Sequence, residues 1–294
     1  MAGLAGLATL SGIPGRILAD AGMKRITILH TNDTHSRIDP YPTNDPNFPG
    51  MGGYARRASL VNHFRREDPE LLLLDAGDFF QGTPYYNMYG GETELVLMSH
   101  LGYTAATLGN HEFDNGMDGL LKVLPHANFP FVCSNYDFSR TMLKDKTIPH
   151  LVLNRNGIRI GIYGLGISLR GLVGANLYGE TVYNDPVDVA REMERELKHE
   201  KKCDLVVCVS HLGFRYDGQR PSDYLVAENT RLTDIIVGGH THRVLNPPEV
   251  VENMENKPVY IGQAGSGGVF LGRMDVVIGP AEDEKFVESN TINI

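Results

Sequence analysis

The sequence is poor in cysteine, has no excess of basic residues and contains no long hydrophobic run. Its cysteines, Cys133, Cys203 and Cys208, are odd in number and lack zinc-ribbon spacing, so we expect buried thiols that pack as small hydrophobes. The formal net charge of −9 argues against a nucleic-acid polymer as partner, because such a partner requires a broad basic surface. No stretch approaches the roughly 18 apolar residues of a membrane-spanning helix, so we expect no transmembrane segment.

Two catalytic signatures are also missing, and this narrows the chemistry. We find neither a Ser-His-Asp arrangement nor a glycine-rich phosphate loop, and no internal repeat or linker divides the chain. Residues 23–294 are therefore predicted to form one domain. Within residues 1–22, the stretch Met1–Pro14 is small and apolar, and Ala19-Asp20-Ala21 resembles a signal-peptide cleavage site. This predicts the remnant of an export signal and a periplasmic or exported protein; the alternative is a disordered tail of a cytoplasmic protein.

Short apolar runs alternate with helix-like stretches along most of the chain, which is typical of an α/β fold. Helices are expected at Gly53–Glu67, at Glu92–Leu101 and after Asp185, where Asp185 can cap and Pro186 suits the first turn. Asn156-Gly157 predicts the tight turn of a β-hairpin. The glycine-punctuated stretch Pro258–Ile278 is expected to supply antiparallel closing strands. The pattern favours two mixed sheets packed face to face.

Five short clusters rich in histidine and acidic residues follow strand-like apolar runs: Thr31–His35, Ala76–Asp78, Gly109–Glu112, Ser210-His211 and Gly238–His242. Residues at the carboxyl ends of the strands of one sheet converge on one edge, where open α/β folds build their sites. The clusters bring together seven or eight side chains that can bind metal, which is too many for a single ion. Two adjacent divalent ions explain the number.

The clusters are informative together, because each one alone has a simpler structural explanation. A lone Gly-Asp such as Gly77-Asp78 is usually a turn, although a carboxylate is also the natural bridge between two cations. Asn110 could be a modest neutral ligand or a cap, and Asp114 could orient the imidazole of His111. Five of the eleven histidines lie at strand ends, and the other six are expected to be structural: His30, His63, His100, His126, His150 and His199.

The candidate ligands carry nitrogen and oxygen donors only. Such a set suits manganese, iron, cobalt, nickel or zinc, and disfavours calcium and magnesium. The absence of cysteine among them fits a hydrolytic centre better than a structural zinc site. The expected cofactors are therefore two divalent metal ions.

In their order along the chain, the motifs Thr-Asn-Asp-Thr-His, Gly-Asp, Gly-Asn-His-Glu, Ser-His-Leu-Gly and Gly-Gly-His-Thr-His resemble those of the calcineurin-like metallophosphoesterases. More closely, they are similar to the catalytic domain of the 5'-nucleotidase branch, over about Arg25 to Asp275. The resemblance implies a metallophosphoesterase fold, a four-layer α-β-β-α sandwich with two mixed sheets and a dinuclear metal centre.

The resemblance also implies a role for each matched residue. One metal would be held by Asp33, His35, Asp78 and His242, and the second by Asp78, Asn110, His211 and His240. His111 and Asp114 match the catalytic dyad of the family. Asn110 and, more weakly, Gln263 match positions that line the substrate site. This chain ends shortly after the last strand of the catalytic domain, so we expect a stand-alone domain without the C-terminal domain that binds the nucleobase.

The leading functional prediction is a phosphomonoesterase of 5'-nucleotidase type, acting on a nucleotide or another small phosphate ester through a metal-activated water. The alternatives are a phosphodiesterase of the cyclic nucleotide type, a hydrolase of sulfur esters similar to a thiosulfohydrolase, and a non-catalytic metal-binding module. The segments Asp39–Gly52 and Phe79–Gly91 follow ligand-bearing strands, so they are either substrate walls or packed surface turns.

Overall fold

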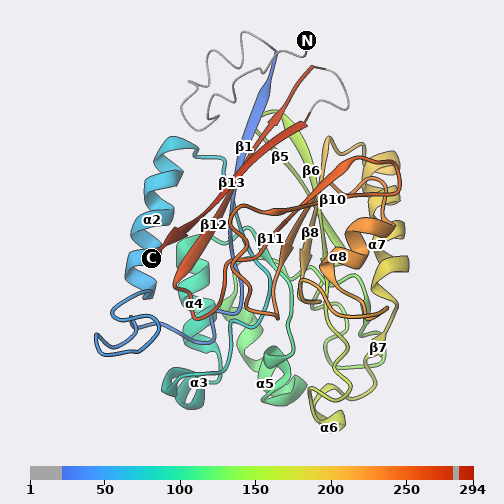
Figure 1. Ribbon diagram of the computed structural model, residues 1–294. Coiled ribbons are helices and arrows are strands. Elements are labelled where there is room, and N and C mark those ends of the chain that lie inside the picture. Colours follow the sequence, from blue (N-terminus) through green and yellow to red (C-terminus); the bar gives the residue numbers. More distant parts are fainter. Residues whose placement is uncertain (1–21, 281–284) are drawn as a thin grey trace.

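The computed structural model describes residues 22–280 and 285–294 of the chain. Two sheets form its centre, with helices on both outer sides (Figure 1). The expected α/β fold with two mixed sheets is confirmed. The predicted export segment, residues 1–22, lies outside the described residues except for Gly22. Among the described residues, no helix has the length and apolar character needed to cross a membrane.

The first sheet has the strand order β13-β12-β1-β2-β3. Strand β1 pairs in parallel with β2, β2 pairs in parallel with β3, and β12 is antiparallel to both β1 and β13. The sheet is therefore mixed, and its parallel strands end at the same edge. Its strands are β1 (Lys24–Thr31), β2 (Leu72–Asp75), β3 (Ala105–Ala106), β12 (Phe270–Ile278) and β13 (Lys285–Asn293).

The second sheet has the order β10-β11-β9-β8-β6-β5, with four parallel strands in the middle and an antiparallel strand at each edge. The expected hairpin is present as β5 and β6, and Asn156 and Gly157 take positive φ angles of 48° and 72° in its turn. The strands are β5 (His150–Arg155), β6 (Ile158–Leu165), β8 (Leu205–Ser210), β9 (Ile235–Gly238), β10 (Glu249–Glu252) and β11 (Pro258–Gly262). A separate ribbon pairs β4 (Tyr136–Asp137) with β7 (Val182–Tyr183).

The prediction for Pro258–Ile278 is only partly correct. Strand β12 is an antiparallel closing strand of the first sheet, but β11 belongs to the second sheet and runs parallel to β9. The chain crosses from one sheet to the other between Gly262 and Phe270, and the sequence pattern does not reveal this crossing.

Three buried apolar clusters separate the four layers. Ile26 and Ile28 of β1 face the core between the sheets, whereas Leu29 faces the outer helices, as the alternation of a strand requires. The first outer layer contains α2 (Tyr54–Glu67), α3 (Pro84–Tyr89), α4 (Glu92–Leu101), η2 (His111–Phe113), α5 (Gly116–Val123) and η3 (Leu124–His126). The other side carries α7 (Pro186–Arg195), η4 (Glu196–Glu200) and α8 (Asp223–Asn229), while α6 (Ala175–Tyr178) packs against α5.

Candidate metal centre

The loops that follow β1, β2, β3, β8 and β9 bring the predicted ligands of both sheets into one region. Three groups of donor atoms, each within 4.8 Å of one another, arise there: Asp33–His35–His242, His35–Asp78–His111 and Asp78–His211–His240. His35 and Asp78 each belong to two groups. The groups are therefore joined into one centre at the ends of strands, although these strands belong to two sheets and not to one sheet as expected.

These loops adopt a backbone conformation that side chains other than glycine rarely take. Asp33, His35, Asp78, His240 and His242 all have positive φ angles, between 46° and 70°. Each such residue costs on the order of 1–3 kcal/mol unless its surroundings hold it, and such strain gathers at functional sites. The strain thus falls on candidate ligands.

Two glycines make the close approach of these loops possible. A Cβ atom on Gly77 would lie 2.5 Å from the backbone nitrogen of Gly109, and one on Gly109 would overlap the Asp78 carboxylate. The loops after β2 and β3 can therefore meet around Asp78 only because both positions lack a side chain.

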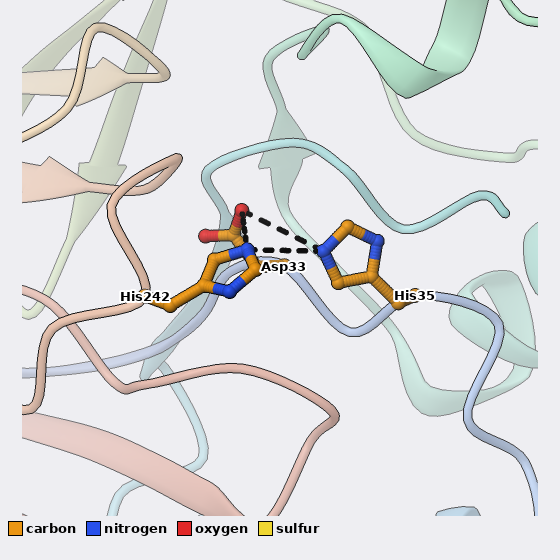
Figure 2. A group of neighbouring side chains, drawn as sticks. All are labelled: Asp33, His35 and His242. Atoms are coloured by element: carbon orange, nitrogen blue, oxygen red, sulfur yellow. Dashed lines mark hydrogen bonds and ion pairs between the residues drawn. The ribbon is translucent and has the colours of Figure 1, made fainter. Parts of the chain in front are cut away.

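Asp33, His35 and His242 form the outer end of the centre. Figure 2 shows the Asp33 carboxylate and the two imidazole rings turned toward one another. The Nε2 atoms of His35 and His242 lie 3.1 Å apart, and His242 Nε2 lies 3.2 Å from Asp33 Oδ1. Two ring nitrogens that face each other and a carboxylate make a donor set suited to one shared cation.

Asp78, His211 and His240 form the inner end. His211 is fully buried, and its Nδ1 donates to the carbonyl oxygen of Ala76 at 2.6 Å, which leaves Nε2 to face the centre. That Nε2 lies 3.1 Å from Asp78 Oδ2, yet it lacks a properly oriented hydrogen-bond partner among the described residues. A buried nitrogen directed at a carboxylate without a hydrogen bond fits a metal ligand. Asn110 joins this end through its Oδ1, 3.0 Å from His240 Nδ1.

Burial and charge shift the pKa values of these groups strongly. Burial would lower the pKa of His211, but the neighbouring Asp78 carboxylate raises it to about 10. Burial would likewise raise the pKa of Asp78, but the His211 imidazole holds it well below its usual range. Burial lowers the pKa of His240 to about 4. An ion bound here would take the place of the His211 proton, since a ligating imidazole is neutral.

His111 and Asp114 lie beside this centre. His111 Nδ1 is 2.7 Å from Asp114 Oδ2, and the backbone N–H of His111 donates to Asp78 Oδ1 at 2.8 Å. The hydrogen bond with Asp114 is the main reason that the pKa of His111 rises to about 9. The ring is about one-third exposed, so it is within reach of a bound molecule.

Gln263 lies next to the centre but is 1% exposed. Its Nε2 donates to the carbonyl oxygen of Gly239 at 2.6 Å, and its Oε1 accepts from Thr241 Oγ1 at 2.9 Å and from the backbone N–H of Arg243. The amide thus supports the loop that carries His240 and His242. The substrate contact expected for Gln263 stays a prediction.

Sequence reasoning missed the function of Glu112 within the Gly-Asn-His-Glu motif. Its buried carboxylate accepts three backbone N–H groups, from Asp78 at 2.9 Å, Phe80 at 3.1 Å and Gly109 at 2.6 Å. It thereby links the loop after β2, which carries Asp78, to the loop after β3. In the sequence, Glu112 directly after His111 could equally be a metal ligand. No local signal marks its carboxylate as an acceptor of backbone hydrogen bonds.

Replacing Glu112 with glutamine is expected to lower the free energy of unfolding by about 1.5–3 kcal/mol, because an amide nitrogen would face at least one of these N–H donors. Chemical denaturation of the metal-free protein measures the change. Glu228→Gln, at an exposed position of α8, is the matched control. Equal stability of the two variants would show that the carboxylate does not fasten the loops.

The chain thus combines a two-sheet α/β fold with histidine and carboxylate groups gathered at the strand ends. This arrangement is typical of metal-binding α/β proteins. A family model described as calcineurin-like phosphoesterase matches residues 26–244, and the chain belongs to this family. The family predicted from the motifs is confirmed.

Named relatives agree with this assignment. The chain is 33% identical over 277 residues to 5'-nucleotidase of Rattus norvegicus. The aligned region covers 85% of this chain and 46% of that protein. It is 31% identical over 299 residues to the trifunctional nucleotide phosphoesterase YfkN of Bacillus subtilis (strain 168), covering 90% of this chain and 19% of YfkN. The crystal structure of a 5'-nucleotidase precursor from Thermus thermophilus matches with a TM-score of 0.82 and 33% identity, over 92% of this chain and 54% of that one. The chain thus spans about half the length of these 5'-nucleotidases.

Proposed function

We propose that the chain is a metal-dependent phosphomonoesterase of 5'-nucleotidase type, acting on a nucleotide or another small phosphate ester. The observation that carries this proposal is the joining of three donor groups through His35 and Asp78, with the His111–Asp114 pair beside them. The names of the relatives, nucleotide phosphoesterase and 5'-nucleotidase, support a nucleotide as substrate. The proposed domain comprises residues 23–294.

We propose two divalent ions, one held by Asp33, His35, Asp78 and His242, and the other by Asp78, Asn110, His211 and His240. The fit rests on the buried His211 Nε2, which faces the Asp78 carboxylate at 3.1 Å, and on the facing nitrogens of His35 and His242. When bound, two such ions lower the pKa of a water toward neutrality and neutralise charge on the phosphoryl oxygens.

The side chains around the ions have separate tasks in this proposal. Asp114 fixes the ring of His111 through Nδ1, so Nε2 is free to give a proton to the leaving oxygen or to bind a phosphoryl oxygen. Asn110 adds an amide oxygen without adding negative charge, which keeps the site open to an anionic substrate. Glu112 holds the loops of Asp78 and Gly109 in place.

Dialysis against a chelator is expected to abolish the hydrolysis of p-nitrophenyl phosphate, and manganese, cobalt or zinc is expected to restore it. The same assay with bis(p-nitrophenyl) phosphate separates a monoesterase from a diesterase, and a thiosulfonate ester tests the sulfur-ester alternative. Turnover that survives complete removal of metal would contradict the proposal. Metal binding without turnover of any ester would favour the non-catalytic module.

We also propose that the protein is exported, because Met1–Pro14 is small and apolar and Ala19-Asp20-Ala21 resembles a cleavage site. N-terminal sequencing of the protein recovered from its host tests this. A mature chain that begins near Gly22 would support export, and a chain that retains Met1 would contradict it.

A further inference from the structure

The loop that carries His35 is the most strained part of the candidate centre. Asp33, His35 and Ser36 have φ angles of 48°, 46° and 54° within four residues. At roughly 1–3 kcal/mol each, three such residues persist only when other contacts fix them.

The imidazole of His35 is not oriented in the way the neighbouring rings are. His211 Nδ1 is bonded to the carbonyl oxygen of Ala76, and His111 Nδ1 is bonded to Asp114. His35 Nδ1 is buried and has no hydrogen-bond partner among the described residues. A metal-binding histidine is normally oriented through its second nitrogen. The His35 ring is therefore placed by its backbone and by its contacts with the rings of His111 and His242, and not by a hydrogen bond at Nδ1.

The backbone N–H groups of His35 and Ser36 donate to the carbonyl oxygens of Asp78 and Phe79 at 3.0 and 2.9 Å, and the side chain of Ser36 adds a second anchor. Its hydroxyl donates to Glu94 Oε1, and Thr83 Oγ1 lies 2.8 Å from both the hydroxyl and the carbonyl oxygen of Ser36. All three side chains are buried, with exposed fractions of 2% for Ser36, 4% for Glu94 and 8% for Thr83. The loop is thus tied to helix α4 by a buried carboxylate 58 residues away in sequence.

The cost of burying Glu94 indicates that this contact matters. A buried carboxylate is unfavourable unless it is paired or fully hydrogen-bonded, and Glu94 Oε2 has no such partner among the described residues. It borders a cavity of about 10 Å³, enough for about one water, which Arg57 and Tyr54 also line. The Glu94 carboxylate thus lies in a buried polar pocket, with Ser36 on one side and the groups of Arg57 and Tyr54 around the cavity.

We propose that Glu94 and Ser36 are positioning residues that set His35 for the ion shared with Asp33 and His242. This inference rests on the proposed dinuclear centre. It makes one end of the centre depend on helix α4: the outer ion requires the Glu94–Ser36 contact, whereas the inner ion, bound by His211 and His240, does not.

Titration of the metal-free protein with Mn²⁺ by calorimetry tests this division. Ser36→Ala removes one hydroxyl, and we expect it to weaken one class of Mn²⁺ sites by about 10–100-fold while the other class changes less than twofold. Glu94→Ala should weaken the same class, with Glu92→Ala, at an exposed position of the same helix, as the matched control. His242→Ala and His240→Ala, each of which removes a ligand from one end, identify the two classes.

The outcomes separate this inference from the proposed function. Selective weakening of the class that His242→Ala also weakens, with activity restored at high Mn²⁺, supports the positioning role. Equal weakening of both classes, or unchanged affinity in both Ser36→Ala and Glu94→Ala, overturns it even if the wild-type protein binds two ions. A wild-type protein that binds no Mn²⁺ overturns the dinuclear centre itself and this inference with it.

Discussion

Replacing Asp78 with asparagine is expected to remove metal from both positions and to abolish hydrolysis. The carboxylate of Asp78 belongs to two of the three donor groups, and Oδ2 lies 3.1 Å from His211 Nε2. An asparagine offers one oxygen and no charge, so it cannot bridge two cations. Loss of a single outer-shell partner costs about 10–100-fold in metal affinity, and loss of a ligand shared by two ions should cost more.

Metal content after dialysis, measured by elemental analysis alongside the p-nitrophenyl phosphate assay, checks this result. Asp118→Asn, at an exposed position of α5, makes the same chemical change away from the centre and should retain both metal and turnover. A fully metallated Asp78→Asn protein would show that the two positions do not share this carboxylate.

The candidate ligands could be predicted because each follows its strand directly. A run such as Leu72–Asp75 is recognisable as a buried strand, and Asp78 comes three residues after it. The same local logic leads from Leu205–Ser210 to His211 and from Ile235–Gly238 to His240. Parallel strands carry the residues of each sheet to one edge, and the packing of the two sheets brings the two edges together.

The supporting residues could not be predicted, because most of their partners are far away in sequence. Glu94 appears in the sequence as an ordinary acidic residue in the first turn of a helix, and Glu112 as a member of the Gly-Asn-His-Glu motif without an assigned function. Both carboxylates are buried, and burial lets them hold the loops of the centre through hydrogen bonds. Their burial depends on how α4 and the loop after β3 pack in three dimensions. Strand β11 was misjudged for the same reason, since its partner β9 is chosen by the crossing between sheets.

His111 belongs to one donor group with His35 and Asp78, so geometry alone permits two functions for it. If His111 is a metal ligand, removing its side chain would also remove a metal ion. If it is a proton donor, removing its side chain would leave both ions in place. The contacts favour the second function, because His111 touches Asp78 through its backbone N–H, while its ring Nε2 is 4.0 Å from Asp78 Oδ2. The hydrogen bond to Asp114 orients the ring as a catalytic acid requires.

Replacing His111 with alanine is therefore expected to preserve two bound ions and to lower kcat by about 10²–10⁴-fold, the usual contribution of a general acid. Metal analysis and steady-state kinetics on the same preparation measure both quantities. Asp114→Asn should lower kcat by less, because the ring keeps its place but loses its charged partner. His100→Ala, at an exposed position of α4, is the control. Loss of an ion in His111→Ala would instead assign the ring to the metal, and undiminished turnover would exclude His111 and Asp114 from the reaction.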